Sequence, residues 1–225
     1  MSAQVAGTTR AKREGPLILA VPRGTLHAET LDRLDAIGVD TDAVRADSRS
    51  LIFETPQLTL LTVRPSDVPT YVESGAADLG ITGKDVLLEQ EERPVYELVD
   101  LDYGECRMVV ATREAEESLD LLERRFGRVK IATKYLNVAK RHFEATGRQV
   151  ELVEIKGSVE LAPLVGLADG IVDLVASGRT LAENGLVERE QIERCTARLV
   201  ANPVSHKLRA SEVDALAERL RATVG

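Results

Sequence analysis

Two acidic residues and a hydroxyl-rich turn lie close together in the stretch Gly157–Val187 and could hold a sugar phosphate. A hydrophobic run, 171–176, leads into the turn Ser177-Gly178-Arg179-Thr180. A buried strand that ends at such a turn leaves backbone N–H groups pointing one way, and these bind phosphate together with hydroxyl and guanidinium donors. Glu160 and Asp173 lie in the same stretch and could take sugar hydroxyls or Mg²⁺. A turn of this type is also common after a strand as an ordinary structural turn that binds nothing. The pattern therefore leaves both a phosphate site and a structural turn open.

Three further predicted strands end at residues that suit an anion. The three turns are Pro22-Arg23-Gly24-Thr25, Gly83-Lys84-Asp85 and Thr133-Lys134-Tyr135. Each is ordinary by itself, and Tyr135 could either stack on a base or fill the core. Together the four strand ends predict a cleft lined with donors for a phosphate-rich ligand. The loops that flank a neighbouring strand contain or adjoin Arg45, Arg49 and Arg64. Three arginines near one strand are weak evidence that the protein binds a polyanion.

Short aliphatic runs alternate with amphipathic stretches, which predicts an α/β protein with mainly parallel sheets. The predicted strands are 17–21, 58–63, 79–82, 107–112, 129–133, 152–155, 172–176 and 198–201. The predicted helices, each with plausible caps, are 26–37, 67–74, 138–146 and 212–222. Because no low-complexity linker is present, we expect two lobes that share the chain by crossing back and forth, with a ligand in the cleft between them.

The composition argues against several classes of protein. The 225 residues include 29 Lys and Arg against 37 Asp and Glu, a net charge of −8, which disfavours general nucleic-acid binding. No apolar run approaches the length of a membrane span, and residues 1–15, expected to form a disordered tail, lack the hydrophobic stretch of a secretory signal. The two cysteines, Cys106 and Cys195, are expected to be free thiols in a reducing cytoplasm. The three histidines lie far apart, which disfavours a metal cage or a histidine-based triad.

Four segments resemble the ATP phosphoribosyltransferase family, in the same order. They are 64–87, 103–111, 131–137 and the long and most specific block 158–186, within a resemblance that runs from about residue 17 to 200. The division expected is 16–104 plus 182–225 for lobe I and 105–181 for lobe II, which carries the phosphate-binding turn. Such a two-lobed fold, of the type II periplasmic-binding-protein kind, also resembles solute-binding proteins. A module that only binds ligand is therefore the alternative function.

The resemblance implies transfer of the phosphoribosyl group of phosphoribosyl pyrophosphate to N1 of the ATP adenine, with release of pyrophosphate. This is the first step of histidine biosynthesis, and it implies Mg²⁺ held mainly by the substrate, with possible help from Asp173. The residues implied for phosphoribosyl pyrophosphate are Glu160, Asp173, Ser177, Gly178, Arg179, Thr180 and Leu181. Those implied for ATP and polyphosphate are Arg23, Gly24, Arg49, Arg64, Asp85, Lys134 and Tyr135. The catalytic group would be Arg23, Glu160, Asp173 and Thr180, with no general base, because a neutral ring nitrogen needs alignment and charge stabilisation more than deprotonation.

The chain departs from the family pattern at three positions. The family turn commonly reads P-K-G-R-L, whereas Thr25 stands here at the arginine position, so either Arg23 compensates or turnover is slower. A member that binds ligand without turnover is thus a second alternative. Leu136 replaces a common proline and Ala176 a common acid, and neither removes an obvious ligand. The length resembles the short form of the family, which implies a homodimer joined to a regulatory subunit similar to histidyl-tRNA synthetase.

Overall fold

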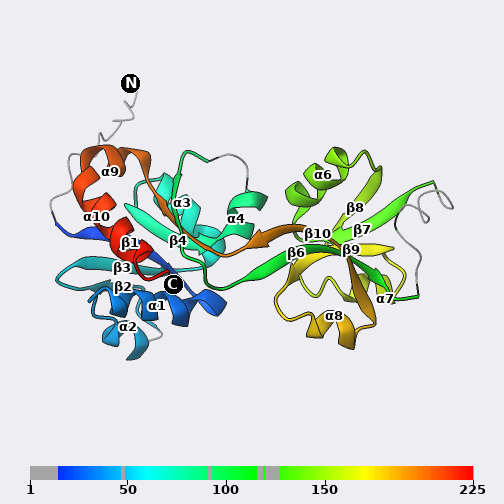
Figure 1. The fold of residues 1–225 in the computed structure, drawn as a ribbon, viewed down its shortest axis with the longest axis horizontal. Coiled ribbons are helices and arrows are strands. Elements are labelled where there is room, and N and C mark those ends of the chain that lie inside the picture. The colour runs from blue at the N-terminus through cyan, green and yellow to red at the C-terminus, as the bar shows by residue number, and fades with distance from the viewer. Residues whose placement is uncertain (1–14, 47–48, 91–92, 116–118, 120–126, 225) are drawn as a thin grey trace, which may run out of the picture.

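The strands of the computed structural model form two sheets that lie side by side along the long axis of the molecule (Figure 1). The structure describes residues 15–46, 49–90, 93–115, 119 and 127–224. Except for Gly15, the expected tail 1–15 therefore lies outside the described residues. We call the six-stranded sheet with its helices the first lobe, and the five-stranded sheet with its helices the second lobe.

The first lobe has the strand order β2-β3-β1-β4-β11-β5. Its strands are β1 Leu17–Pro22, β2 Ile52–Glu54, β3 Leu58–Val63, β4 Leu79–Gly83, β5 Tyr96–Asp100 and β11 Ala197–Ala201. Its helices are α1 His27–Ala36, α2 Asp42–Ala46, α3 Val68–Glu73, α4 Lys84–Glu89, α9 Pro203–Leu208 and α10 Ala210–Arg221, with 3-10 turns at Gly24–Leu26 and Pro65–Asp67.

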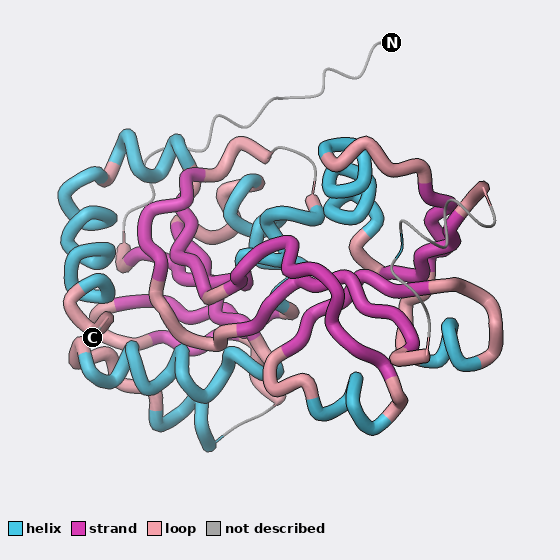
Figure 2. Tube along the Cα trace, turned by 45° about the vertical axis from the view of Figure 1, so that its right-hand side comes forward, coloured by secondary structure: helices cyan, strands magenta, loops and turns pink. Residues whose placement is uncertain are grey.

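The second lobe has the strand order β10-β6-β9-β7-β8. Its strands are β6 Cys106–Arg113, β7 Val129–Thr133, β8 Val150–Glu154, β9 Gly170–Val175 and β10 Leu186–Cys195. Its helices are α6 Leu136–Ala145, α7 Leu161–Leu164 and α8 Arg179–Glu183. Figure 2 shows helices on both sides of the strands, as the alternation of aliphatic and amphipathic segments predicts.

The two sheets are mixed, which corrects the expectation of mainly parallel sheets. Parallel pairing is confined to β3-β1-β4 and β8-β7-β9. Strands β2, β5, β6, β10 and β11 pair antiparallel with their neighbours. For β5, β6, β10 and β11 the cause is the way the chain changes lobes, because it crosses as extended strands without the helical crossover that parallel pairing requires. Strand β2 forms a short hairpin with β3 inside the first lobe.

Alternate residues of each central strand pack into different cores. In β1, Leu19 faces a core shared with α1 and α10, and its neighbour Ala20 faces the core beneath α3. The approach of α3 to β4 depends on Gly80, where a Cβ would lie 2.4 Å from a Val68 methyl group. In the second lobe one core lies beneath α6 and the other beneath α7 and α8. The central strands β4 and β9 are therefore almost wholly buried on both faces.

The chain crosses between the lobes twice, and the two crossing segments pair with each other. The N–H of Leu101 donates to the carbonyl of Ala197, and the N–H of Ala197 donates to the carbonyl of Tyr103, both at 2.9 Å. The return crossing thus follows β10, which pairs with β6 in the second sheet. The expected boundary near residue 182 is displaced to Thr196, because a charged strand such as β10 carries no hydrophobic run to signal it.

Two helix starts also differ from the sequence-based expectation. Helix α6 begins at Leu136, before Asn137, and the residue preceding it makes no side-chain capping bond. Helix α10 begins at Ala210, so Ser211 lies inside its first turn instead of capping it. At α6 the acceptor comes from elsewhere in the fold, because the Glu89 carboxylate accepts its first N–H groups.

Candidate functional site

The predicted anion-binding turns lie at the carboxyl ends of the parallel strands in both lobes. In the first sheet Pro22 is level with Val63, so the turns after β1 and β3 leave from one edge, beside the turn after β4. In the second sheet Thr133 is level with Glu154 and Val172, which brings the turns after β7, β8 and β9 together. This edge is where α/β proteins bind ligands.

Side chains from the two lobes meet at these edges. The hydroxyl of Tyr135, which follows β7, donates to Asp85 Oδ2 at 3.3 Å across the lobes. Lys134 Nζ lies 3.4 Å from Asp173 Oδ1 and 5.0 Å from the centre of the Tyr135 ring. We call Asp85, Lys134, Tyr135 and Asp173 the interlobe cluster. All four were predicted as site residues, and Tyr135 is both buried and hydrogen-bonded.

The carboxylates of this cluster are held in an environment that disfavours their charge. Burial raises the pKa of Asp173 above its usual range, and the nearby Glu160 carboxylate raises it further, while Lys134 and the Leu174 N–H oppose the shift. Burial likewise raises the pKa of Asp85. The pKa of Tyr135 is raised by burial and by the Asp85 and Asp173 carboxylates. A buried Asp173 and a half-buried Asp85 with one cation nearby are the kind of group found at binding sites.

The hydroxyl-rich turn begins at Ser177, two residues after β9 ends at Val175 and four residues after Asp173. Gly178 has φ +76°, a left-handed conformation that favours glycine. Ser177, Arg179 and Thr180 are exposed, whereas Leu181 is buried in the core beneath α8. The Arg179 N–H lies 3.4 Å from Ser177 Oγ. The turn therefore presents backbone and hydroxyl donors on a fixed base, which suits a phosphate.

The arginines of the first lobe lie at the same sheet edge but have structural partners of their own. Arg23 donates to the Ser50 carbonyl at 3.1 Å and to Thr62 Oγ1 at 3.0 Å. It lines a cavity of about 500 Å³ with Gly24. Arg45 is paired with Asp32 and Asp35 at 2.7 and 2.6 Å, so the hint of polyanion recognition does not extend to it. Arg49 and Arg64 are exposed.

Glu89 is a junction residue that the sequence did not indicate. Its carboxylate, at the end of α4 in the first lobe, accepts the N–H groups of Asn137 and Val138 at 3.0 Å each. The Asn137 side chain in turn donates to the Glu89 carbonyl at 2.8 Å. A carboxylate here satisfies the free N–H groups of α6 and complements its dipole. No sequence signal could reveal this cap, because its two halves are 48 residues apart.

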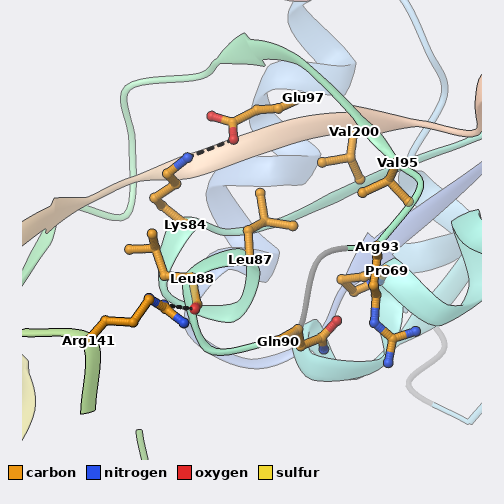
Figure 3. A pocket seen from close by; sticks show the side chains of 10 residues that line it. All are labelled: Pro69, Lys84, Leu87, Leu88, Gln90, Arg93, Val95, Glu97, Arg141 and Val200. Atoms are coloured by element: carbon orange, nitrogen blue, oxygen red, sulfur yellow. Dashed lines mark hydrogen bonds and ion pairs between the residues drawn. The ribbon is translucent and has the colours of Figure 1, made fainter. Parts of the chain in front are cut away.

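A second cavity, of about 520 Å³, lies beside α4 and is lined from both lobes, because Arg141 of α6 is part of its wall (Figure 3). Its wall combines the aliphatic side chains Leu87, Leu88, Val95 and Val200 with charged groups, among them Lys84, Arg93 and Arg141. Lys84 pairs with Glu97 at 2.7 Å, and Arg141 donates to the Leu88 carbonyl. Lys84, from the predicted turn Gly83-Lys84-Asp85, lines this cavity, whereas the residues assigned to either substrate do not.

Two further features concern only the part of the chain that the structure describes. Within it, no cluster of three or more His, Cys, Asp or Glu side chains has the arrangement of a metal site. No helix there has the length and apolar character needed to cross a membrane.

A family model and several proteins related in sequence match most of this chain. The family model described as "HisG: ATP phosphoribosyltransferase" matches residues 64–222. ATP phosphoribosyltransferases of Geobacillus sp. (strain WCH70) and Bacillus subtilis (strain 168) are each 45% identical over 210 residues, which is 92% of this chain and 98% and 95% of theirs.

Solved structures agree with these relatives. The ATP phosphoribosyl transferase (HisG:HisZ) complex from Thermotoga maritima matches with a TM-score of 0.78 and 36% identity, over 92% of this chain and 98% of the other. The VFT2 domain of Bordetella pertussis BvgS matches with a TM-score of 0.57 at 12% identity, over 93% of this chain and 88% of the domain. At that identity the BvgS likeness concerns the fold alone, and it supports the periplasmic-binding-protein-like architecture.

Proposed function

The chain belongs to the ATP phosphoribosyltransferase family, as an enzyme of the first step of histidine biosynthesis, and we propose that its substrates meet between the two lobes, at the interlobe cluster. The observation that carries this proposal is the pair of contacts Tyr135–Asp85 and Lys134–Asp173. The first contact joins the two lobes, and the second joins the ends of β7 and β9 within the second lobe. Strand-end turns can therefore reach one ligand from two sides.

Phosphoribosyl pyrophosphate is assigned to the second lobe. The turn 177–181 would hold its 5-phosphate through backbone N–H groups and the Ser177 and Thr180 hydroxyls, with Arg179 supplying positive charge. Asp173 and Glu160 would accept hydrogen bonds from the ribose hydroxyls. Glu160 raises the pKa of Asp173, so the two carboxylates lie close enough to act on the same sugar.

ATP is assigned to the face formed by both lobes. Tyr135 and Asp85 would contact the adenine, and Arg23 with Gly24, Arg49 and Arg64 would face the phosphates from the first lobe. Positive charge from Lys134 and Arg23 would stabilise the leaving pyrophosphate. A neutral nitrogen attacking an oxocarbenium-like carbon needs this alignment and charge stabilisation, and no general base is assigned.

Mg²⁺ fits this site as a substrate-borne ion. Asp173 and Glu160 offer the oxygen ligands that Mg²⁺ prefers, and a site with few protein carboxylates is typical of an ion that binds with substrate phosphates. Bound there, Mg²⁺ would neutralise charge on the pyrophosphate. Asp173 is the residue proposed to hold it, and Lys134 would limit the charge accumulated on the protein side.

The assembly proposed for the chain follows the Thermotoga relative, which was solved as a HisG:HisZ complex. We propose a cytoplasmic homodimer joined to a regulatory subunit of that kind, similar to histidyl-tRNA synthetase. The chain by itself would be active and insensitive to histidine. Strong inhibition of the purified chain by histidine would overturn this part of the proposal.

The site assignment is tested by mixing the purified chain with ATP, Mg²⁺ and phosphoribosyl pyrophosphate and following pyrophosphate and a new ultraviolet-absorbing adduct. Thr180→Ala and Asp173→Asn should mainly impair the use of phosphoribosyl pyrophosphate, seen as a raised KM or lowered kcat/KM for that substrate. Glu183→Ala, an exposed change on the same short helix, is the matched control. Wild-type kinetics in both site variants would refute the placement of the site.

A further inference from the structure

The two cysteines lie opposite each other where the chain crosses between the lobes. Cys195, the last residue of β10, is paired in register with Cys106, the first residue of β6. Directly opposed residues of an antiparallel pair share a face, with Cβ atoms about 4.5–5.5 Å apart. A disulfide needs a Cβ separation of about 3.5–4.5 Å. A small approach of the two strands is therefore enough to join the sulfurs.

The two thiols differ in accessibility. Cys195 is 1% exposed, whereas Cys106 is partly exposed, and both are free thiols. Interaction with Cys195 lowers the pKa of Cys106, and the same interaction together with burial raises the pKa of Cys195. An accessible thiol of lowered pKa attacks disulfides first, and a buried neighbour then acts as the resolving thiol.

We propose that Cys106 and Cys195 are a redox modification site, converted to an intramolecular disulfide by low-molecular-weight disulfides such as glutathione disulfide. The Cys106 thiolate attacks one oxidant sulfur, forms a mixed disulfide and releases one glutathione thiolate. The Cys195 sulfur then attacks Cys106 Sγ, gives up its proton to solvent and releases the second glutathione. Two protein thiols are oxidised to one disulfide, and glutathione disulfide is reduced to two glutathiones.

The position of this pair ties its redox state to the movement of the lobes. The residues that follow β10 and precede β6 form the paired crossing segments, in which Asp102 and Gly104 have φ of +50° and +63°. The Thr196 carbonyl also accepts the N–H of Lys84 at 2.9 Å, which ties the crossing to α4. A covalent bond here fixes the two crossing strands against each other, so it restricts bending between the lobes.

The same pair lies close to the interlobe cluster. The charges of Asp85 and Lys134 act on the Cys106 thiol, and Cys106 acts on Tyr135. A shift of β6 on forming the disulfide is therefore passed to groups proposed to bind ATP. A displacement of about 1 Å at reacting groups can cost about a hundredfold in rate, so the oxidised enzyme is expected to be impaired.

The covalent step is tested by mass spectrometry and does not depend on the proposed function. The reduced full-length chain is incubated with glutathione disulfide, and its intact mass and peptide map are measured. The expected result is the loss of two hydrogens and a cross-linked peptide pair. Cys195→Ser should stop at a stable glutathione adduct on Cys106, and Cys106→Ser should show neither product. A wild-type chain that carries only glutathione adducts, or that cross-links only between chains, would overturn the proposal.

The effect on turnover is the second readout. Oxidised wild type should lose kcat/KM by on the order of tenfold or more and recover it with dithiothreitol, while Cys106→Ser treated with the oxidant should keep its untreated rate. If Cys195→Ser folds poorly, Cys195→Ala serves in its place. Full activity of the cross-linked chain would refute the coupling between the crossing and the site. Absence of turnover in the reduced wild type would instead count against the proposed function.

Discussion

The cap that Glu89 provides to α6 should hold the two lobes together, and Glu89→Ala should loosen them. In the wild type the Glu89 carboxylate accepts two N–H groups of the second lobe at 3.0 Å each. Truncation to alanine leaves both N–H groups without this acceptor and removes a negative charge from a helix N-terminus. It also leaves Asn137 bonded only to the backbone of α4.

The size of the effect follows from the two interactions that are lost. A helix N-cap contributes about 0.5–2 kcal/mol, and a charge near the dipole adds about 0.3–1 kcal/mol. We therefore expect the free energy of unfolding to fall by about 2 kcal/mol, with Tm lower by about 4–8 °C for a chain of this size. Glu89→Gln keeps an acceptor without the charge and should lose about half as much.

The functional consequence is that a smaller fraction of molecules has the two lobes joined through α4 and α6. If substrates bind only that state, about 2 kcal/mol raises the KM values by up to about thirtyfold, with a smaller effect on kcat. The assay combines thermal unfolding with steady-state kinetics for both substrates. Glu144→Ala is the control, because its partner Lys140 lies 4.0 Å away and both side chains are mostly exposed. A Glu89→Ala variant whose Tm and KM values equal those of Glu144→Ala would refute the reasoning.

Three further predictions concern the proposed site. Because burial raises the pKa of Asp173, its contribution to stability is greatest below the pKa of an unfolded aspartate and is lost as pH rises through the folded value. Asp173→Asn should therefore unfold at a higher temperature than wild type at pH 7–8 but not under acid conditions. Its kcat/KM should fall. A Tm below that of wild type at pH 7–8 would contradict this. Gly178→Ala should cost about 1–2 kcal/mol, because a Cβ at φ +76° is strained, and should raise KM for phosphoribosyl pyrophosphate more than for ATP, as steady-state kinetics can show. Thr25→Arg should raise kcat if that position helps pyrophosphate leave, whereas an unchanged kcat in single-turnover and steady-state assays would mean that Arg23 already compensates.

Local sequence patterns were sufficient to predict most elements near the site. The strands around Leu19, Leu60, Ile131 and Val172 were expected from their aliphatic runs, and all lie in the sheets. Strand β1 is buried on both faces and is a continuous apolar run, whereas Thr59 interrupts β3 and Lys130 interrupts β7. The strand β10 gave no such signal, because it is an edge strand whose solvent face carries charged residues such as Glu188 and Glu193.

The family signature, the phosphate-type turn at Gly178 and the acids Glu160 and Asp173 were all readable from the sequence, because each depends on residues that are neighbours along the chain. Only the tertiary structure joined Tyr135 to Asp85, placed Glu89 on the end of α6 and set Cys106 opposite Cys195. These contacts depend on the way the chain crosses twice between two sheets. The pairing of strands far apart in sequence is set by packing of the whole fold, and no short stretch of residues encodes it.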